Sequence, residues 1–208
     1  MINENIHYRL PLKLINSYSW ARLNYPGRAI LPVMGIHIDL RNNQARPGIE
    51  LISKLSGYSN LGFVRAGIND LINHNLIIRQ KEGRHYVYSL TGLSFCKHGS
   101  GYLPIYKGAM ILSRKWAGLT PSEKSLYPVM GNKARINDPE AEDSGFYAIG
   151  NIYEINKYIE WAGISRSSFY RAYKGLNRKG LIGFWGDEDF CRYGIYVPQY
   201  CCAKSAPY

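Results

Sequence analysis

The sequence predicts an α+β protein, mainly helical, that contains two copies of one small unit. Three observations lead to this class. A 16-residue segment occurs twice, each copy precedes helical periodicity that ends in two short strands, and the composition is that of a folded chain. Of the 208 residues, 46% are hydrophobic and 20% are charged, which are ordinary values for globular domains.

The repeat sets the organisation. Residues 20–35 (WARLNYPGRAILPVMG) and 116–131 (WAGLTPSEKSLYPVMG) are identical at seven of 16 positions, at an offset of 96 residues. This period is too long for a solenoid unit and suits two copies of a small domain. A Gly-rich stretch between the copies predicts a linker. We therefore expect domain 1 at residues 1–92, the linker at 93–101, and domain 2 with a short C-terminal tail at 102–208.

Each copy is expected to start with a helix beside a buried tryptophan. Residues 120–123 (TPSE) have the pattern of a capping box, with proline at the first helical position. Pro32 and Pro128 are expected to kink or end these helices, because proline cannot donate a backbone hydrogen bond. Trp20 and Trp116 are expected to pack in the core.

Two more helices and a hairpin follow in the first copy. Val64, Ile68 and Leu71 recur at helical spacing and are predicted to face inward. Asn75 is expected at the end of the second of these helices. The predicted elements are helices at about 48–56 and 60–74 and strands at 76–80 and 85–90.

The second copy has the same order. Gly163 predicts a sharp turn, Ser165 a helix N-cap, and Gly180 the end of the following helix. An acidic turn at residues 186–189 joins the two strands. The predicted elements are helices at about 152–162 and 166–179 and strands at 181–185 and 193–197.

Each copy therefore has the order helix, helix, tight turn, helix and hairpin, which is the order of a winged helix-turn-helix unit. The full prediction is two tandem winged-helix domains. The third helix of such a unit fits the major groove, and the hairpin reaches the backbone. The charge agrees, since 26 Lys and Arg against 15 Asp and Glu give +11, and a basic protein favours a polyanionic partner.

The pattern Gly163-x-Ser165-x-Ser167, followed by an apolar helix and residues 179–182 (KGLI), resembles the helix-turn-helix domains of many bacterial regulators. The upstream Trp-Ala-x-Leu is similar to the version in plasmid and phage replication proteins, and the tandem layout resembles plasmid replication initiators. This resemblance implies sequence-specific binding of double-stranded DNA, in transcription regulation or in plasmid or phage replication initiation. In such initiators one winged helix often pairs two subunits. The resemblance therefore implies, as an alternative, a homodimer or a complex with another protein through one winged helix.

The third helix of the second copy is expected to contact bases, because Arg can pair bidentately with guanine and Ser can bond a base or a phosphate. Cations near a helix C-terminus are also favoured by the macrodipole, which offers a structural alternative for the last of these residues. The candidates are Ser165, Arg166, Ser167, Ser168, Tyr170, Arg171, Lys174 and Arg178.

The first copy has a poorer helix and a richer hairpin. It is expected to add backbone contacts or a protein contact. The acidic hairpin of the second copy is expected to point away from DNA or to meet a protein. The candidates in the first copy are Asn60, Arg65 and Asn69 on the helix and Arg79, Lys81 and Arg84, with His85, on the hairpin.

Other classes find little support in the sequence. There is no GxxxxGK[ST] motif and no metal or nucleophile pattern around the five His, so we expect no enzyme, no catalytic residue and no cofactor. Cys191, Cys201 and Cys202 lack a CxxC pair, so no zinc is expected. No apolar run approaches the length of a membrane span. Together with the absence of a secretory signal, this predicts a cytoplasmic protein, associated with a bacterial nucleoid or plasmid. The competing class is a protein–protein interaction module.

Overall fold

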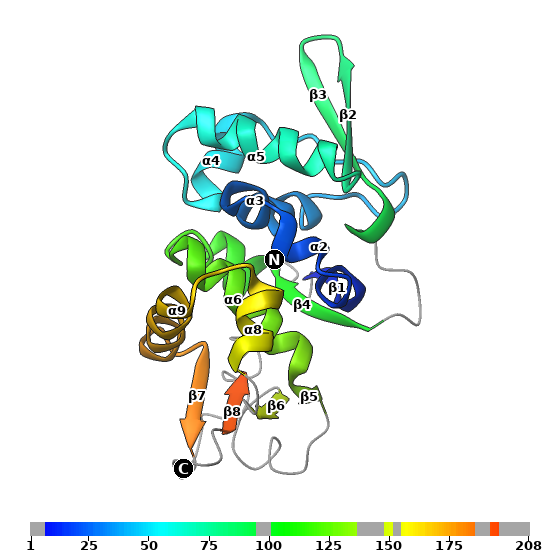
Figure 1. Cartoon of the computed structure of the whole chain (residues 1–208). Helices are drawn as coiled ribbons and strands as arrows, with labels where there is room; N and C mark the ends of the chain where they lie inside the picture. The colour runs from blue at the N-terminus through cyan, green and yellow to red at the C-terminus, as the bar shows by residue number, and fades with distance from the viewer. Residues whose placement is uncertain (1–6, 95–100, 137–147, 152–154, 186–191, 196–208) are drawn as a thin grey trace, which may run out of the picture.

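The computed structural model describes residues 7–94, 101–136, 148–151, 155–185 and 192–195 (Figure 1). The described part is α+β and mainly helical, as predicted. Most of the expected linker, the acidic turn at 186–189 and the C-terminal tail lie outside the described residues.

The first repeat contains the elements that the periodicity predicts, to within about two residues. Its helix α5 ends where Asn75 adopts the left-handed conformation, with φ of 53°. The elements are β1 His7–Pro11, α1 Leu12–Asn16, α2 Ser19–Arg22, α3 Tyr25–Gly35, α4 Ile49–Ser56, α5 Leu61–Asn73, β2 Ile77–Glu82, β3 His85–Leu90 and the 3-10 turn η1 Gly92–Ser94.

The second repeat has the same order of main helices and hairpin, with two further short strands, β5 and β6. Its capping box is confirmed, because the Thr120 side chain accepts from the Glu123 N–H and the Glu123 carboxylate accepts from the Thr120 N–H. The elements are β4 Tyr102–Tyr106, the π-helix η2 Lys107–Leu112, α6 Pro121–Lys133, β5 Arg135–Ile136, β6 Ala148–Asn151, α8 Ile155–Ala162, α9 Arg166–Arg178, β7 Ile182–Trp185 and β8 Arg192–Ile195.

Pro32 and Pro128 were expected to kink or end their helices, and they do not end them. Helix α3 continues three residues past Pro32, and α6 continues to Lys133. Both helices are buried along most of their length. Packing on all sides therefore outweighs the loss of one backbone hydrogen bond near the C-terminal end of each helix.

Helices α3 and α6 lie against each other at the centre of the molecule. Figure 1 shows α4, α5 and the β2–β3 hairpin above this pair and α8, α9 and β7 below it. The buried side chains of both repeats form one hydrophobic core. Strands β1 and β4 also join the repeats, because they pair antiparallel with Leu10 opposite Leu103.

The two tryptophans are fully buried and connect the repeats reciprocally. The Trp20 Nε1 donates to the Ser125 carbonyl at 3.0 Å, and the Trp116 Nε1 donates to the Ala29 carbonyl at 2.8 Å. Donor and acceptor are each displaced by 96 residues between the two bonds. Each tryptophan therefore packs on the central helix of the other repeat.

The glycines that precede α5 and α9 make a second reciprocal contact. Both adopt positive φ, 81° at Gly57 and 58° at Gly163. A Cβ at Gly57 would lie 2.2 Å from the Ala117 carbonyl oxygen, and one at Gly163 would lie 2.5 Å from the Ala21 carbonyl oxygen. In each repeat the turn between α4 and α5, or between α8 and α9, therefore packs directly on the Trp-Ala backbone of the opposite repeat.

Arg28 and Lys124 are buried cations at equivalent positions of the two repeats, and they lie beside these turns. The Arg28 guanidinium donates to carbonyls of its own repeat and to the Ala162 carbonyl of the other repeat at 2.5 Å. The Lys124 Nζ donates to the Leu119 and Ala117 carbonyls. Burial lowers the pKa of Arg28 to about 10 and that of Lys124 to about 8.

We predict that Trp116→Phe lowers the free energy of unfolding of the whole chain by about 2 kcal/mol or more, because it removes a buried hydrogen bond and leaves a cavity. Urea unfolding followed by circular dichroism measures this. The matched control is Trp161→Phe, since Trp161 is only half-buried on α8. Two separate transitions, of which only one shifts, would contradict the shared core.

A second prediction concerns Lys124. Its ammonium titrates near pH 8 in the folded chain and near its ordinary value of 10.5 when unfolded. Between these values the unfolded chain binds more protons, so this group makes stability rise with pH by up to about 1.4 kcal/mol per pH unit. Urea unfolding of the wild type and of Lys124→Met across this range isolates the effect. Parallel pH dependences of the two proteins would refute it.

Candidate nucleic-acid interface

Helix α9 is fixed on α6 by a buried face of Phe169, Ala172 and Leu176. The helix begins at Ser165, whose Oγ accepts from the Ser168 N–H at 3.2 Å. It ends before Gly180, which has a φ of 65°. The sequence therefore sets both ends of this helix with ordinary capping residues.

One buried carboxylate anchors the C-terminal end of α9. The Lys179 ammonium donates to Glu123, whose carboxylate also caps the first turn of α6. Gly175 permits this approach, because a Cβ there would lie 1.9 Å from the Glu123 Oε1. Lys179 therefore has a structural role, and like Arg178 beside it, it is exposed.

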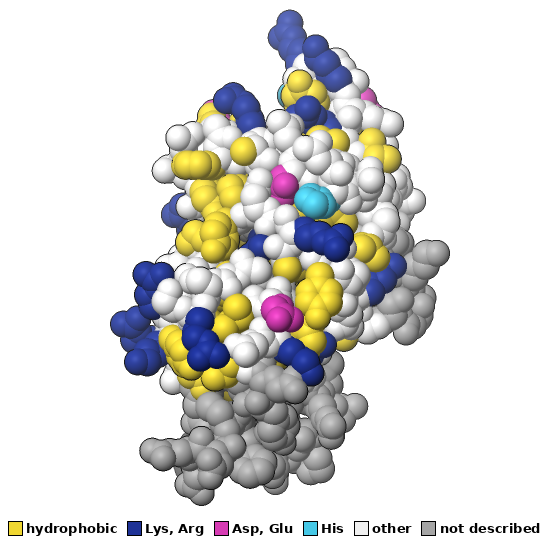
Figure 2. All heavy atoms as spheres, in the orientation of Figure 1, with side chains coloured by type: hydrophobic (Ala, Val, Ile, Leu, Met, Phe, Trp, Pro, Cys, Tyr) yellow, Lys and Arg dark blue, Asp and Glu magenta, His cyan; other side chains and the backbone are white. Residues whose placement is uncertain are grey.

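The face of α9 that points away from α6 carries the residues predicted to contact bases. All eight lie at the surface, with Ser168 half-buried and the others exposed. The 13 residues of α9 include four Arg and Lys and no Asp or Glu. Figure 2 shows dark-blue side chains gathered along the α9 edge of the molecule and at the tip of the β2–β3 hairpin.

Neutral side chains accept hydrogen bonds from two of the three arginines of α9. The Arg166 Nη2 donates to the Asn156 Oδ1 on α8 at 2.8 Å, and the Arg171 Nη2 donates to the Ser168 Oγ at 3.3 Å. Tyr170 is 44% exposed and stacks edge-on against Phe169 at 5.5 Å between ring centroids. Because these bonds compensate no charge, the helix presents positive charge on an ordered side-chain array.

The matching face of α5 is less polar. Counted from the N-caps Asn60 and Ser165, α5 carries Leu61, Gly62 and Phe63 where α9 carries Arg166, Ser167 and Ser168. The Asn60 Oδ1 accepts from the Gly62 N–H at 2.7 Å, so this candidate caps α5. Asn69 is exposed one helical turn beyond Arg65.

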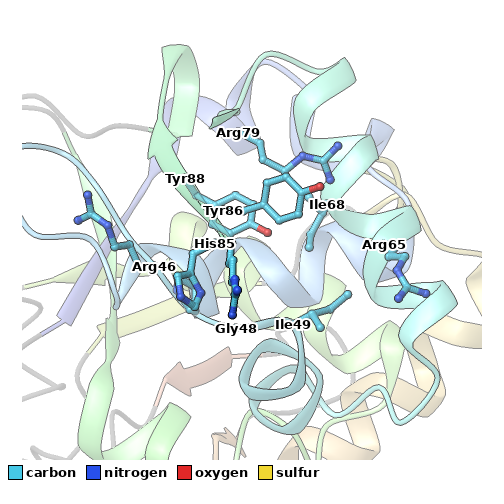
Figure 3. Close-up of a pocket in the computed structure, with 11 residues that line it drawn as sticks. Arg46, Gly48, Ile49, Arg65, Ile68, Arg79, His85, Tyr86 and Tyr88 are labelled. Carbon is cyan, nitrogen blue, oxygen red and sulfur yellow. The ribbon is translucent and has the colours of Figure 1, made fainter. Parts of the chain in front are cut away.

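Four predicted residues of the first repeat meet at one cavity. Arg65 from α5 and Arg79, Arg84 and His85 from the hairpin line a cavity of about 420 Å³ beside the N-terminus of α4 (Figure 3). Lys81 lies on the hairpin but does not line the cavity, and neither do Asn60 and Asn69. Most of the predicted residues therefore form two surfaces, the α9 face and this cavity.

The cavity also contains residues that sequence reasoning missed. Arg46 reaches it because the backbone of Ala45 pairs with Tyr88 on β3, with N–O distances of 2.8 and 2.9 Å. Tyr86 and Tyr88 also line the cavity. Arg46 lies in a loop without periodicity, about forty residues from its hairpin partner, so no local pattern predicts its position.

The cavity is strongly basic. Its eleven lining residues include four Arg, one His and no carboxylate. Arg46 is paired at the rim with Glu82 at 2.9 Å. The guanidinium of Arg79 lies 5.0 Å from the ring centroid of Tyr86, and burial raises the pKa of Tyr88. Such a lining favours an anionic ligand.

No protein-family model, curated protein or solved structure matches this chain. Among the described residues, no group of three or more His, Cys, Asp or Glu is placed to hold a metal ion. Cys191, Cys201 and Cys202 lie outside the described residues. None of the described helices has the length and hydrophobicity needed to span a membrane.

We predict that Ser165→Ala lowers the free energy of unfolding by about 1 kcal/mol, because it removes the N-cap of α9. The matched control is Ser167→Ala on the same exposed turn, whose hydroxyl makes no cap and is expected to change stability by less than about 0.5 kcal/mol. Thermal or urea unfolding measures both. Equal effects of the two changes would contradict the capping role.

Proposed function

We propose that this chain is a sequence-specific DNA-binding protein with two winged helix-turn-helix units, in which α9 inserts into the major groove of double-stranded DNA. The observation that carries the proposal is the exposed face of α9. It presents Arg166, Ser167 and Arg171 near the N-terminal end of an ordered helix with no carboxylate. Arg and Ser at these positions are suited to base edges and phosphates.

The topology supports the winged-helix part of the proposal. In both repeats a tight turn joins two helices, and a hairpin follows the second helix. In both repeats the segment before the first of these helices also pairs with the last hairpin strand. Ala45 pairs with Tyr88 in one repeat, and β6 pairs with β8 in the other.

The hairpin of the first repeat supplies the backbone contacts in this proposal. Arg79, Lys81 and Arg84 are exposed on or next to its strands. Contacts from such cations to phosphates carry no sequence information but set affinity and register. The two repeats thus differ in role, with base recognition assigned to the second.

The biological roles that fit this proposal are transcription regulation and plasmid or phage replication initiation, in a cytoplasmic, non-enzymatic protein. Selection of bound sequences from a random duplex pool distinguishes them. A palindrome is expected for a dimeric regulator and direct repeats for an initiator that binds as a monomer.

A protein-interaction role is the second candidate, and one observation favours it. Leu51 on α4 is 39% exposed and Phe63 on α5 is 55% exposed, and apolar side chains of this size are common at protein contacts. Absence of duplex binding at about 50 mM salt would favour this candidate over DNA binding.

We predict that Arg166→Ala with Arg171→Ala removes most of the preference for the selected sequence over random duplex, because each bidentate base contact contributes about 1–3 kcal/mol of discrimination. Lys81→Ala with Arg84→Ala is expected to weaken binding to both duplexes equally and to reduce the salt slope by about 2. Fluorescence anisotropy over a salt series measures both effects.

The control for these variants is Lys13→Ala with Arg22→Ala, which removes the same charge from exposed positions of α1 and α2. It is expected to leave the discrimination unchanged. An equal loss on selected and random DNA from both test pairs would refute the assignment of base recognition to α9.

A further inference from the structure

We propose that the basic cavity between α4, α5 and the β2–β3 hairpin binds a small phosphorylated aromatic molecule of mononucleotide size. This goes beyond the proposed function, because it assigns a small-molecule site to a cavity whose Arg79 and Arg84 also belong to the hairpin proposed to contact the DNA backbone. Three features of the cavity lead to it, namely its charge, its apolar wall and its size.

The charged part of the lining is suited to a phosphoryl group. Arg65 and Arg84 come from different elements and line the same space, and guanidinium groups bind phosphate oxygens bidentately. Helix α4 begins at the cavity with Gly48 as its N-cap, and no side chain caps its first turn. The first-turn N–H groups and the helix dipole therefore add to the field from the arginines, and the acidic Glu50 of the same turn does not line the cavity.

The other part of the lining is apolar and aromatic. Ile49 and Ile68 line the cavity together with Tyr88, which is only 4% exposed. Figure 3 shows Arg79 and Tyr86 side by side at its wall, and their guanidinium-to-centroid distance is 5.0 Å. A stacked guanidinium and phenol ring present a flat surface on which an aromatic ring can stack.

The size distinguishes a small ligand from a DNA backbone. Cavities that enclose small molecules have volumes of about 300–1,000 Å³ and combine apolar walls with a few polar groups. The volume of about 420 Å³ lies in this range. A backbone phosphate needs only surface cations, so it does not account for the apolar wall formed by Ile49, Ile68 and Tyr88.

The cation set belongs to the first repeat alone. The two hairpins have equal spacing from the ends of α5 and α9, so positions correspond at an offset of 105 residues. At this offset Tyr170, Phe184 and Asp189 occupy the sequence positions of Arg65, Arg79 and Arg84. The hairpin architecture itself therefore does not require the three arginines.

The test is isothermal titration of the full chain with AMP, GMP, CMP and UMP separately, and with inorganic phosphate and adenosine. At least one mononucleotide is expected to bind about 10-fold or more tightly than phosphate or adenosine. Arg65→Ala and Arg84→Ala are each expected to reduce this affinity about 10-fold. The matched control Arg22→Ala, an exposed arginine on α2, is expected to leave it unchanged, and melting curves verify that all variants fold.

The outcomes separate this proposal from DNA binding. Mononucleotide binding that depends on Arg65 and Arg84 supports it, even if the chain binds no duplex. Phosphate that binds as tightly as every mononucleotide overturns it in favour of a simple anion site. Duplex binding that depends on Arg65 and Arg84, without heat from any mononucleotide, also overturns it and assigns the cavity to the DNA backbone.

Discussion

Two indole hydrogen bonds across the α3–α6 pair are the constraint on which the rest of the structure depends. Trp20 and Trp116 each donate to a carbonyl of the other repeat, at Ser125 and Ala29. Both accepting carbonyls lie three residues before a proline, in the turn where the proline ring disturbs the regular bonding of the helix. The indole of each repeated tryptophan is therefore hydrogen-bonded to the opposite repeat.

The reciprocal contacts between the two repeats also determine where α5 and α9 lie at the surface. Gly57 and Gly163 pack closely against the backbone of the opposite repeat. The positions of the turns before α5 and α9 therefore depend on how the two repeats pack against each other. Arg28 and Lys124 fill the space beneath these turns and satisfy carbonyls that would otherwise be buried without partners. Side chains on α9 are thus presented from a scaffold that the whole chain builds, and such rigidity favours precise contact with a ligand.

Local signals in the sequence were enough to predict much of this fold. The capping residues Thr120 and Ser165, the left-handed ends after α5 and α9, and the periodicity of the inward faces all act within a few residues. The helical continuity through Pro32 was not predictable in this way, because it depends on burial by distant segments. Arg46 was missed for the same reason, since its place at the cavity is fixed by the pairing of Ala45 with β3. A repeat in the sequence shows that two segments are similar. It does not show that each segment supplies hydrogen-bond partners to the other.

The reciprocal indole hydrogen bonds between the repeats also have an evolutionary consequence. A single repeat alone would hold a tryptophan and an acceptor carbonyl that cannot meet each other, whereas two identical copies would satisfy both bonds across a two-fold axis. The reciprocal bonds in this chain are those that two repeats related by such an axis would make, joined here in one polypeptide. Fusion frees each half to diverge, because a substitution no longer appears twice in the assembly. One repeat could then gain a cation-rich helix and the other a cavity, while the indole hydrogen bonds between the two repeats stayed the same.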